Sequence, residues 1–570
     1  MSTQQSSNSP DGQTSSSVPM QREHSDSSVT SSSGHFAAKA DAGTAAADTD
    51  IEAQKDEITT EPLARHETGA SAAGGRSILS RLSKSKTKEK LPPPTLPIMD
   101  LDNGVVGWES QHDPEMPLNF TPFRKWFIVA MLSTITFMTP FASSNLAPGI
   151  KNIAETFHAE DNLTKASMPV SIFLLGYAVG PLFLSPLSEI YGRSIVLLSS
   201  CVFFCVWLIG CALAPSLDSL IVFRFLSGLG GSAVLTVGGA IIADIFQVSE
   251  RGRAMTIWML GPMVGPSCGP VIGGFVAQTI GWRWVNWISF IPSTLTVIAM
   301  IIFSRETNAQ VLIERKTKKL RQELNRPELR SCYIDPAKPA VTKQQILLNG
   351  LIRPIKMLFQ SVMLFGLSIY IAFLYGCLYL LFNTIPIVFE GQYGWTVGIA
   401  GLVYLTLLVG YMVSLWLFYK LSDSTVVKLT NANGGVYEPE MRLPHCIWFA
   451  AVIPASFFWY GWSANYTVHW IVPVLGIVPF GFGIIGVWLP IQAYLIDSFP
   501  QYAASALAAF SVLRCAVAAF LPLAGPAMYA NLGVGWGTSL LGFIALAMVP
   551  IPIIVHRKGK WLRERFPISL

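Results

Sequence analysis

Two arginines lie inside long apolar segments, and they are the residues of this sequence most able to do chemistry there. Arg514 lies in the middle of an apolar run at 503–528, and Arg224 lies near the start of another at 219–243. A charge at the centre of a lipid bilayer costs at least about 2.5 kcal/mol, so a charged residue kept there is a functional candidate. Arg224 has an alternative, because a side chain this close to a helix end is able to extend to the membrane surface.

The elements that must position these arginines are long apolar helices. Of the 570 residues, 51% are hydrophobic and 13% are charged, whereas a soluble globular chain carries about 25% charged residues. The charges gather before residue 125, at 305–356 and after residue 556. The runs between them show no β-strand alternation and have the ~20 residues that a membrane-spanning helix needs.

We therefore predict an all-α membrane protein with twelve transmembrane helices in two pseudo-symmetric six-helix halves. The spans are predicted at 126–148, 167–188, 195–216, 219–243, 254–278, 284–304, 362–388, 397–419, 444–463, 469–492, 503–528 and 535–556. The halves share short matches, with Ala243-Asp244-Ile245-Phe246 ending the fourth span and Ile496-Asp497-Ser498-Phe499 ending the tenth. Such repeats place a substrate site between two halves that rock against each other.

Lysine and arginine predict the orientation, because the cytoplasmic loops of membrane proteins carry an excess of both. With the N-terminus in the cytoplasm, the outer loops hold only Lys151, Lys165 and, at a helix edge, Arg283. Both termini are then cytoplasmic, and the protein lies in the plasma membrane or, alternatively, the vacuolar membrane. Two glycosylation sequons, at Asn162 and Asn465, fall in outer loops.

The six-helix halves occupy 111–304 and 357–556, and 557–570 is a basic cytoplasmic tail. Residues 1–110 are predicted to be a disordered cytoplasmic tail, because they are rich in Ser, Ala, Thr and Gly and poor in large apolar residues. A basic run at 81–90 within this tail either contacts anionic lipid or is solvated.

The central cytoplasmic loop, 305–356, joins the halves and has two interpretations. Leu312, Ile313 and Leu320 would form the apolar face of a helix that rests on the inner leaflet. The alternative is a solvated linker.

The loop after the second span contains Glu189, Gly192 and Arg193. Glycine permits a tight turn there, and the two charges are able to form ion pairs or meet helix termini. This loop resembles the cytoplasmic loop signature of the major facilitator superfamily, where it latches one state of the transport cycle. The resemblance implies that Arg193 pairs with Asp244 and that Glu189 meets the start of the eleventh helix.

The fifth span carries a repeated Gly-Pro pattern. It consists of Gly261, Pro262, Gly265, Pro266, Gly269, Pro270, Gly273 and Gly274. Glycine at every fourth position leaves a smooth stripe that a neighbouring helix is able to approach, and the prolines remove backbone hydrogen bonds and bend the helix. The pattern resembles the antiporter motif of proton-driven exporters, which most uptake relatives lack. A helix that merely packs closely would explain the glycines but not the prolines.

Two further resemblances narrow the family branch. The segment 224–231 is similar to the superfamily's second motif, whose buried arginine is linked to proton transfer, so Arg224 and Arg514 become the candidates for proton coupling. The motifs 282–284, 306–307 and 439–444 resemble the fungal twelve-span drug:proton antiporters, the branch with polyamine and multidrug resistance exporters.

The resemblance also implies where a substrate binds, because the first, fourth, seventh and tenth helices of this superfamily line the cavity. The candidates on these helices are Asn145, Tyr375, Tyr379, Asn383, Trp488 and Gln492. A lining of aromatic and amide groups suits amphipathic molecules. Alternatively, the tyrosines and tryptophan pack between helices or lie at the membrane interface.

Acidic residues are absent from the middle of every predicted span, since Asp244, Glu390 and Asp497 lie near span ends. A polyamine site would need buried carboxylates. Their absence favours neutral, amphipathic or anionic cargo and leaves the proton carrier open.

We predict a proton-driven exporter of small amphipathic molecules, drugs or secondary metabolites that works by alternating access. It would need no cofactor besides the proton gradient, bind lipid and a small-molecule substrate but no nucleic acid, and act as a monomer. The alternatives are an uptake symporter or an organic-acid or polyamine transporter on the same fold, and a non-transporting sensor. The sequence has no Walker loop, nucleophile–base set or metal-ligand spacing, which argues against an ATP-driven pump and an enzyme.

Overall fold

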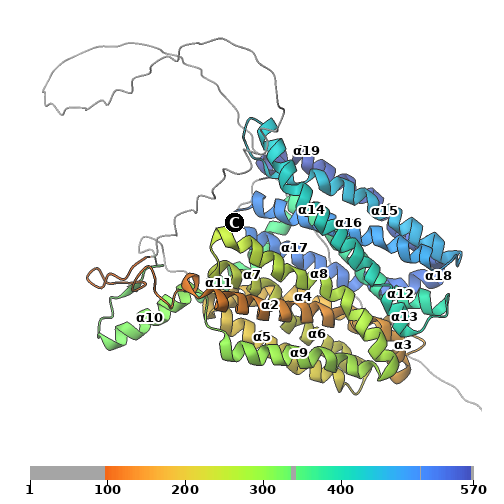
Figure 1. Ribbon diagram of the computed structural model, residues 1–570, viewed down its shortest axis with the longest axis horizontal. Helices are drawn as coiled ribbons and strands as arrows, with labels where there is room; N and C mark the ends of the chain where they lie inside the picture. The colour runs from red at the N-terminus through yellow and green to blue at the C-terminus, as the bar shows by residue number, and fades with distance from the viewer. Residues whose placement is uncertain (1–96, 335–341, 501, 567–570) are drawn as a thin grey trace, which may run out of the picture. The chain divides into compact units, whose positions relative to one another are not determined.

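The computed structural model describes residues 97–334, 342–500 and 502–566 (Figure 1). The predicted basic run at 81–90 lies outside the described residues. Nearly all of the described structure is helical, and two short strands, β1 (Val105–Val106) and β2 (Arg330–Ser331), form one parallel pair.

Six membrane-spanning segments form the N-terminal half. Their helices are α2 (Pro122–Ser144), α4 (Leu163–Tyr191), α5 (Arg193–Ala212), α6 (Leu217–Gly231) with α7 (Ala233–Ile245), α8 (Val248–Thr279) and α9 (Trp282–Phe303). Three shorter elements, η1 (Pro117–Asn119), η2 (Ala147–Gly149) and α3 (Ile150–Thr156), flank α2.

The C-terminal half repeats this arrangement after two amphipathic connecting helices, α10 (Ala309–Glu323) and α11 (Lys343–Gln360). Its helices are α12 (Val362–Gly391), α13 (Val397–Leu402) with α14 (Leu405–Ala432), α15 (Pro444–Asn465), α16 (Ile471–Ser498), α17 (Ala503–Phe520), α18 (Gly525–Met548) and α19 (Pro550–Arg565). The 3-10 turns η3 (Pro439–Arg442) and η4 (Leu521–Ala524) precede α15 and α18.

Several helices begin where a polar side chain satisfies a free backbone N–H. Asn162, Ser216, Thr342 and Ser361 start α4, α6, α11 and α12, and each accepts a hydrogen bond from the N–H three residues later. Such caps offset the loss of hydrogen bonding at the first turn of a helix.

Twelve spans are present in the described residues, although only eleven stretches qualify by length and hydropathy. The last stretch, Ala503–Arg565, has 63 residues and would be roughly 95 Å long as one helix, far more than the ~30 Å of a bilayer core. Gly533 breaks it with a φ of 73° and a ψ of 170°. The break falls between the predicted eleventh and twelfth spans, and the predicted fold class is confirmed.

The packing partners repeat between the halves, as the predicted duplication requires. In the N-terminal half α2 packs on α8, α4 on α6 and α5 on α9, and the equivalent helices pair as α12 with α17, α14 with α16 and α15 with α18. Contacts between the halves are made mainly by α4 with α17 and by α8 with α13.

The segment before the first span is folded, which corrects the prediction that the disordered tail extends to residue 110. Trp108 is 1% exposed and packs with Val106, Met116, Ile313 and Leu329 in a small core. The central loop contains two helices, α10 and α11, so it is not an unstructured linker. The predicted apolar face of α10 packs on the segment before the first span, and α10 lies beyond one end of the helix bundle, opposite α13 (Figure 1). These ends are the α10 end and the α13 end below.

Candidate functional site

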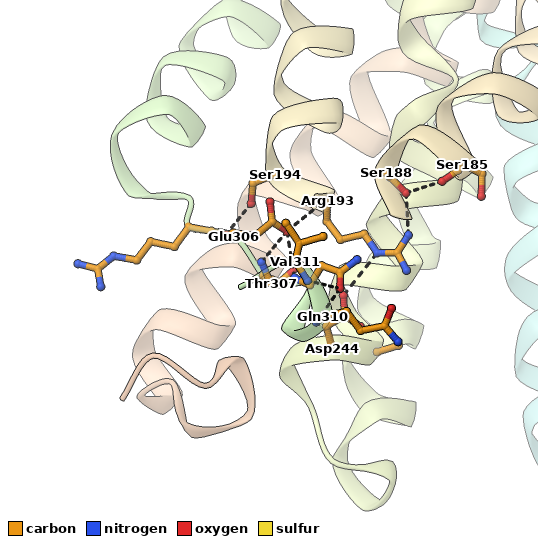
Figure 2. Close-up of polar contacts among 12 residues, drawn as sticks. Ser185, Ser188, Arg193, Ser194, Asp244, Glu306, Thr307, Gln310 and Val311 are labelled. Carbon is orange, nitrogen blue, oxygen red and sulfur yellow. Dashed lines mark hydrogen bonds and ion pairs between the residues drawn. The ribbon is translucent and has the colours of Figure 1, made fainter. Parts of the chain in front are cut away.

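The loop between α4 and α5 lies at the α10 end, and the side chains of Arg193 and Glu306 hold it in place. Gly192 adopts a φ of 110°, a conformation that glycine accepts without strain. The next residue, Arg193, places its Nε 3.6 Å from Oδ2 of Asp244 at the end of α7 and donates through Nη1 to Ser188 Oγ at 2.6 Å. The pair that the resemblance implied is thus present (Figure 2), whereas its role as a gate stays a prediction.

Glu306, just after α9, clamps the same loop and had no role assigned from the sequence. Its Oε1 accepts hydrogen bonds from the backbone N–H groups of Arg193, Thr307 and Asn308 at 2.7, 3.0 and 3.0 Å (Figure 2). A Cβ at Gly192 would collide with this carboxylate. Glycine at position 192 therefore has two functions: it permits the positive φ of the turn, and it leaves space for the Glu306 carboxylate.

Glu189 does not make its expected contact. Its side chain is exposed, and among the described residues it forms neither a hydrogen bond nor an ion pair. The predicted interaction with the start of the eleventh helix, α17, is therefore absent from this conformation.

The C-terminal half carries a comparable ion pair at the end of its tenth span, α16. Arg442 Nε lies 2.7 Å from Asp497 Oδ2 at the end of α16, and Tyr437 donates its hydroxyl to the same oxygen at 2.5 Å. Burial alone would lower the pKa of Arg442, but its hydrogen bonds to Asp497 and Tyr437 raise that pKa above the ordinary value. Glu440 in η3 pairs with Arg563 of α19 beside this ion pair.

The glycine stripe of α8 lies directly on the backbone of α2. A Cβ at Gly265 would lie 2.7 Å from the carbonyl oxygen of Phe137, and one at Gly269 would lie 2.6 Å from that of Phe141. Pro270 has no N–H to donate to the carbonyl of Pro266 one turn earlier. Ser144 Oγ of α2 donates to this carbonyl instead, at 2.8 Å. The missing proline N–H thus leaves a backbone acceptor on α8 that forms a hydrogen bond to α2, in addition to the close packing that the glycines permit.

The halves meet closely at the α13 end. Lys151 Nζ lies 2.9 Å from Glu390 Oε2, and the Glu390 side chain is 8% exposed. The N–H of Gly398 in α13 donates to Gln278 Oε1 of α8 at 2.8 Å. A small cavity of about 40 Å³ beside Lys151 reaches Asn383.

Arg224 is fully buried in the N-terminal half, so it does not extend to the membrane surface. Its Nε donates to the carbonyl of Pro169 at 2.9 Å and its Nη2 to that of Ser143 at 3.1 Å. The ring of Phe173 covers the guanidinium at 4.7 Å. The charge is therefore held by carbonyl dipoles and an aromatic face.

Arg514 is the buried arginine of α17 in the C-terminal half, and its surroundings differ from those of Arg224. Its guanidinium lies 4.6 Å from the ring centroid of Tyr375 and 5.1 Å from that of Trp488. Tyr375 contacts the ring of Tyr379 at 5.3 Å, and the Tyr379 hydroxyl lies 2.8 Å from Ser143 Oγ. The two arginines are thus joined through a chain of contacts that crosses from one half to the other.

The three remaining cavity candidates, Asn145, Asn383 and Gln492, differ in their surroundings. Asn145 is turned away from the boundary between the halves, because its Nδ2 donates to Ser289 Oγ and Val285 O of α9 at 2.8 and 3.3 Å. Asn383 donates to Ser171 of α4 at 3.4 Å and lies between the halves. Gln492 has a buried Oε1 without a hydrogen-bond partner in the described structure.

Both sequon asparagines are exposed at loops. Asn162 Oδ1 accepts a hydrogen bond from the N–H of Lys165 at 2.9 Å, and Asn465 Oδ1 accepts one from Gly535 at 3.3 Å. Glycosylation at either position stays a prediction. In the described ranges no three His, Cys, Asp or Glu side chains are grouped so as to hold a metal ion.

Two related six-helix bundles with buried charges at their boundary define a membrane transporter. A family model described as the Major Facilitator Superfamily matches residues 132–522. The chain is 43% identical to the MFS transporter cpaT of Aspergillus oryzae over 467 residues, 82% of this chain and 93% of that relative. It is 41% identical to the efflux pump radE of Floropilus chiversii over 472 residues, 82% and 87% of the two chains.

A solved structure shows the same fold. The crystal structure of a D-xylose-proton symporter matches 75% of this chain and 97% of its own with a TM-score of 0.57 at 17% identity. The family model and the relatives at 41–43% identity show that the chain belongs to the major facilitator superfamily. Its relatives are named as transporters and efflux pumps, as expected for a protein predicted not to be an enzyme.

Proposed function

We propose that this protein exports small amphipathic molecules in exchange for protons, with drugs or secondary metabolites as its cargo. A relative that is 41% identical is named as an efflux pump, which supports the outward direction. The protein would act as a monomer in the plasma membrane, with both termini in the cytoplasm and no cofactor besides the proton gradient.

The observation that carries the proposal is the backbone contact between α8 and α2. Gly265 and Gly269 bring the two helices together, and α8 also reaches the other half, since a Cβ at Gly401 would lie 2.9 Å from the carbonyl oxygen of Pro270. A Gly-Pro helix with this double contact is able to close the α13 end while the α10 end exchanges cargo. The resemblance of the motif to that of proton-driven exporters supports antiport over uptake.

A vesicle assay tests the direction and the coupling. The purified protein is reconstituted with the α10 end facing outward, the lumen is made acidic, and fluorescent amphipathic dyes are added outside. Antiport predicts that dye accumulates in the acidic lumen and that the lumen becomes more alkaline as it does so. Accumulation that instead requires an acidic exterior would establish a symporter, and dye movement that ignores the pH gradient would refute proton coupling.

A further inference from the structure

The buried side chain of Arg514 has a hydrogen-bond donor that no acceptor in the described structure satisfies. Its side chain is 8% exposed, and its Nε is buried without a hydrogen-bond partner in the described part of the chain. Two aromatic rings flank it, those of Tyr375 and Trp488. A buried guanidinium costs free energy unless an anion or hydrogen-bond acceptors satisfy its donors, so an acceptor for the Nε of Arg514 would stabilise this site.

Arg224 differs from Arg514 in having backbone acceptors, although its own Nη1 also lacks a partner among the described residues. Arg224 donates to the carbonyls of Pro169 and Ser143, whereas no backbone carbonyl in the described structure accepts from Arg514. The carboxylates near the span ends are already engaged, since Asp244, Glu390 and Asp497 pair with other cations. These three carboxylates are therefore not available as partners for the unpaired Nε of Arg514.

Two polar atoms of α16, the helix that carries the Trp488 ring beside Arg514, also lack partners. Trp488 Nε1 and Gln492 Oε1 of α16 are both buried and unpaired among the described residues. They lie four residues apart, so they share one face of the helix. Buried polar atoms in native proteins nearly always have partners. The Trp488 N–H and the Gln492 carbonyl oxygen are therefore free to hydrogen-bond a bound ligand.

We propose that Arg514 binds the anionic group of an aromatic cargo, a carboxylate or an acidic phenolate, while the rings of Tyr375 and Trp488 stack on its aromatic body. This inference rests on the proposed function and names the charge class of the exported molecule. A planar guanidinium suits a carboxylate because it donates two parallel hydrogen bonds. The same positive charge repels a cationic cargo of equal size.

Binding is tested separately from transport, with two probes that share one xanthene ring system. The purified full-length protein is titrated with fluorescein, an anion, and with rhodamine 123, a cation, and quenching of tryptophan fluorescence reports binding. The wild type is expected to bind fluorescein at least tenfold more tightly than rhodamine 123. Arg514→Gln should weaken fluorescein binding about 10–100-fold, the usual effect of losing hydrogen bonds to a charged group.

Two further variants make the result specific. Arg514→Lys keeps the charge but not the planar fork, so it should recover part of the fluorescein affinity and show that the fold tolerates a change at this position. Arg253→Gln is the control, because Arg253 lies over Trp126 at the α10 end, away from Arg514, and it should leave both affinities unchanged.

The inference is overturned when the wild type does not bind fluorescein, binds rhodamine 123 equally well, or keeps its fluorescein affinity after Arg514→Gln. Failure of the proposed function looks different. In that case fluorescein binds and depends on Arg514, but a pH gradient does not drive its movement across vesicles.

Discussion

Gly265→Ala tests whether α8 and α2 need to touch backbone to backbone. The added Cβ would lie 2.7 Å from the Phe137 carbonyl oxygen and 3.1 Å from the Phe141 nitrogen. Ordinary contacts of a Cβ begin at 3.4 Å, so α8 would have to retreat from α2 by about 0.7 Å, the difference between 3.4 and 2.7 Å. No side chain is able to yield instead, because both clashing atoms belong to the backbone.

The cost follows from two opposing effects. Forcing a methyl group into a packed contact costs about 1–3 kcal/mol, whereas alanine in place of glycine stabilises a helix by about 0.5–1 kcal/mol. Gly252→Ala provides the matched control in the same helix, because nothing lies within 4 Å of a Cβ at Gly252. The helix-propensity gain cancels between the two variants, so their difference in stability should be the contact alone, about 1–3 kcal/mol.

The assay compares the two variants and the wild type in mixed micelles with increasing SDS. We expect Gly252→Ala to match or slightly exceed the wild-type free energy of unfolding and Gly265→Ala to fall below both. Dye export measured in vesicles should fall in the same order. Equal unfolding free energies and equal export for the two alanine variants would refute the claim that α8 depends on this close approach.

The remaining predictions concern the two ends of the bundle. Trp108→Ala removes the largest side chain of the small core at the α10 end, so it should cost that unit about 3–5 kcal/mol and speed proteolysis within 97–120; an unchanged cleavage rate would contradict this. Lys151→Ala leaves the buried Glu390 unpaired and should open the α13 end, which faster maleimide labelling of an Asn383→Cys variant would report. Lys165→Ala breaks an exposed ion pair and should leave labelling unchanged.

Local composition predicted the spans because the bilayer imposes a simple rule on every helix that crosses it. Charges are excluded from about 20 residues at a time, so the gaps between charges mark the spans without any knowledge of packing. The break at Gly533 illustrates this. The predicted eleventh and twelfth spans leave it between them, and two helices meet there at a kink.

Contacts between distant segments were harder to predict. The repeat identified Asp497 as the counterpart of Asp244, but the partner of Asp497 is Arg442, which lies in η3 at the far end of the loop after the eighth span, not directly after that span as Arg193 follows the second. Glu306 was noted only as part of a family motif, and its three backbone acceptor contacts depend on how α9 ends beside Gly192. Such positions follow from tertiary packing, which short matches within one sequence do not encode.

The folded segment at 97–110 was missed because its composition was averaged with the long polar stretch before it. Val105, Val106 and Trp108 are large apolar residues in a region otherwise poor in them, and this clustering was the available signal. The partner surface on α10 shows the same helical spacing of apolar residues that suggested a membrane contact. An amphipathic face alone does not tell lipid from protein.

The two buried arginines also explain how the middle of the bundle is able to part. Arg224 takes its carbonyl partners from α2 and α4, both in the N-terminal half, and Arg514 contacts rings from α12 and α16, both in the C-terminal half. In the proposed rocking of the halves, each charge would therefore travel with its own half. The link that must break between them is the hydrogen bond of two neutral hydroxyls, Ser143 and Tyr379, which is worth about 0.5–1.5 kcal/mol. An ion pair broken at that depth would cost several times more, and the Lys151–Glu390 pair between the halves lies at the α13 end.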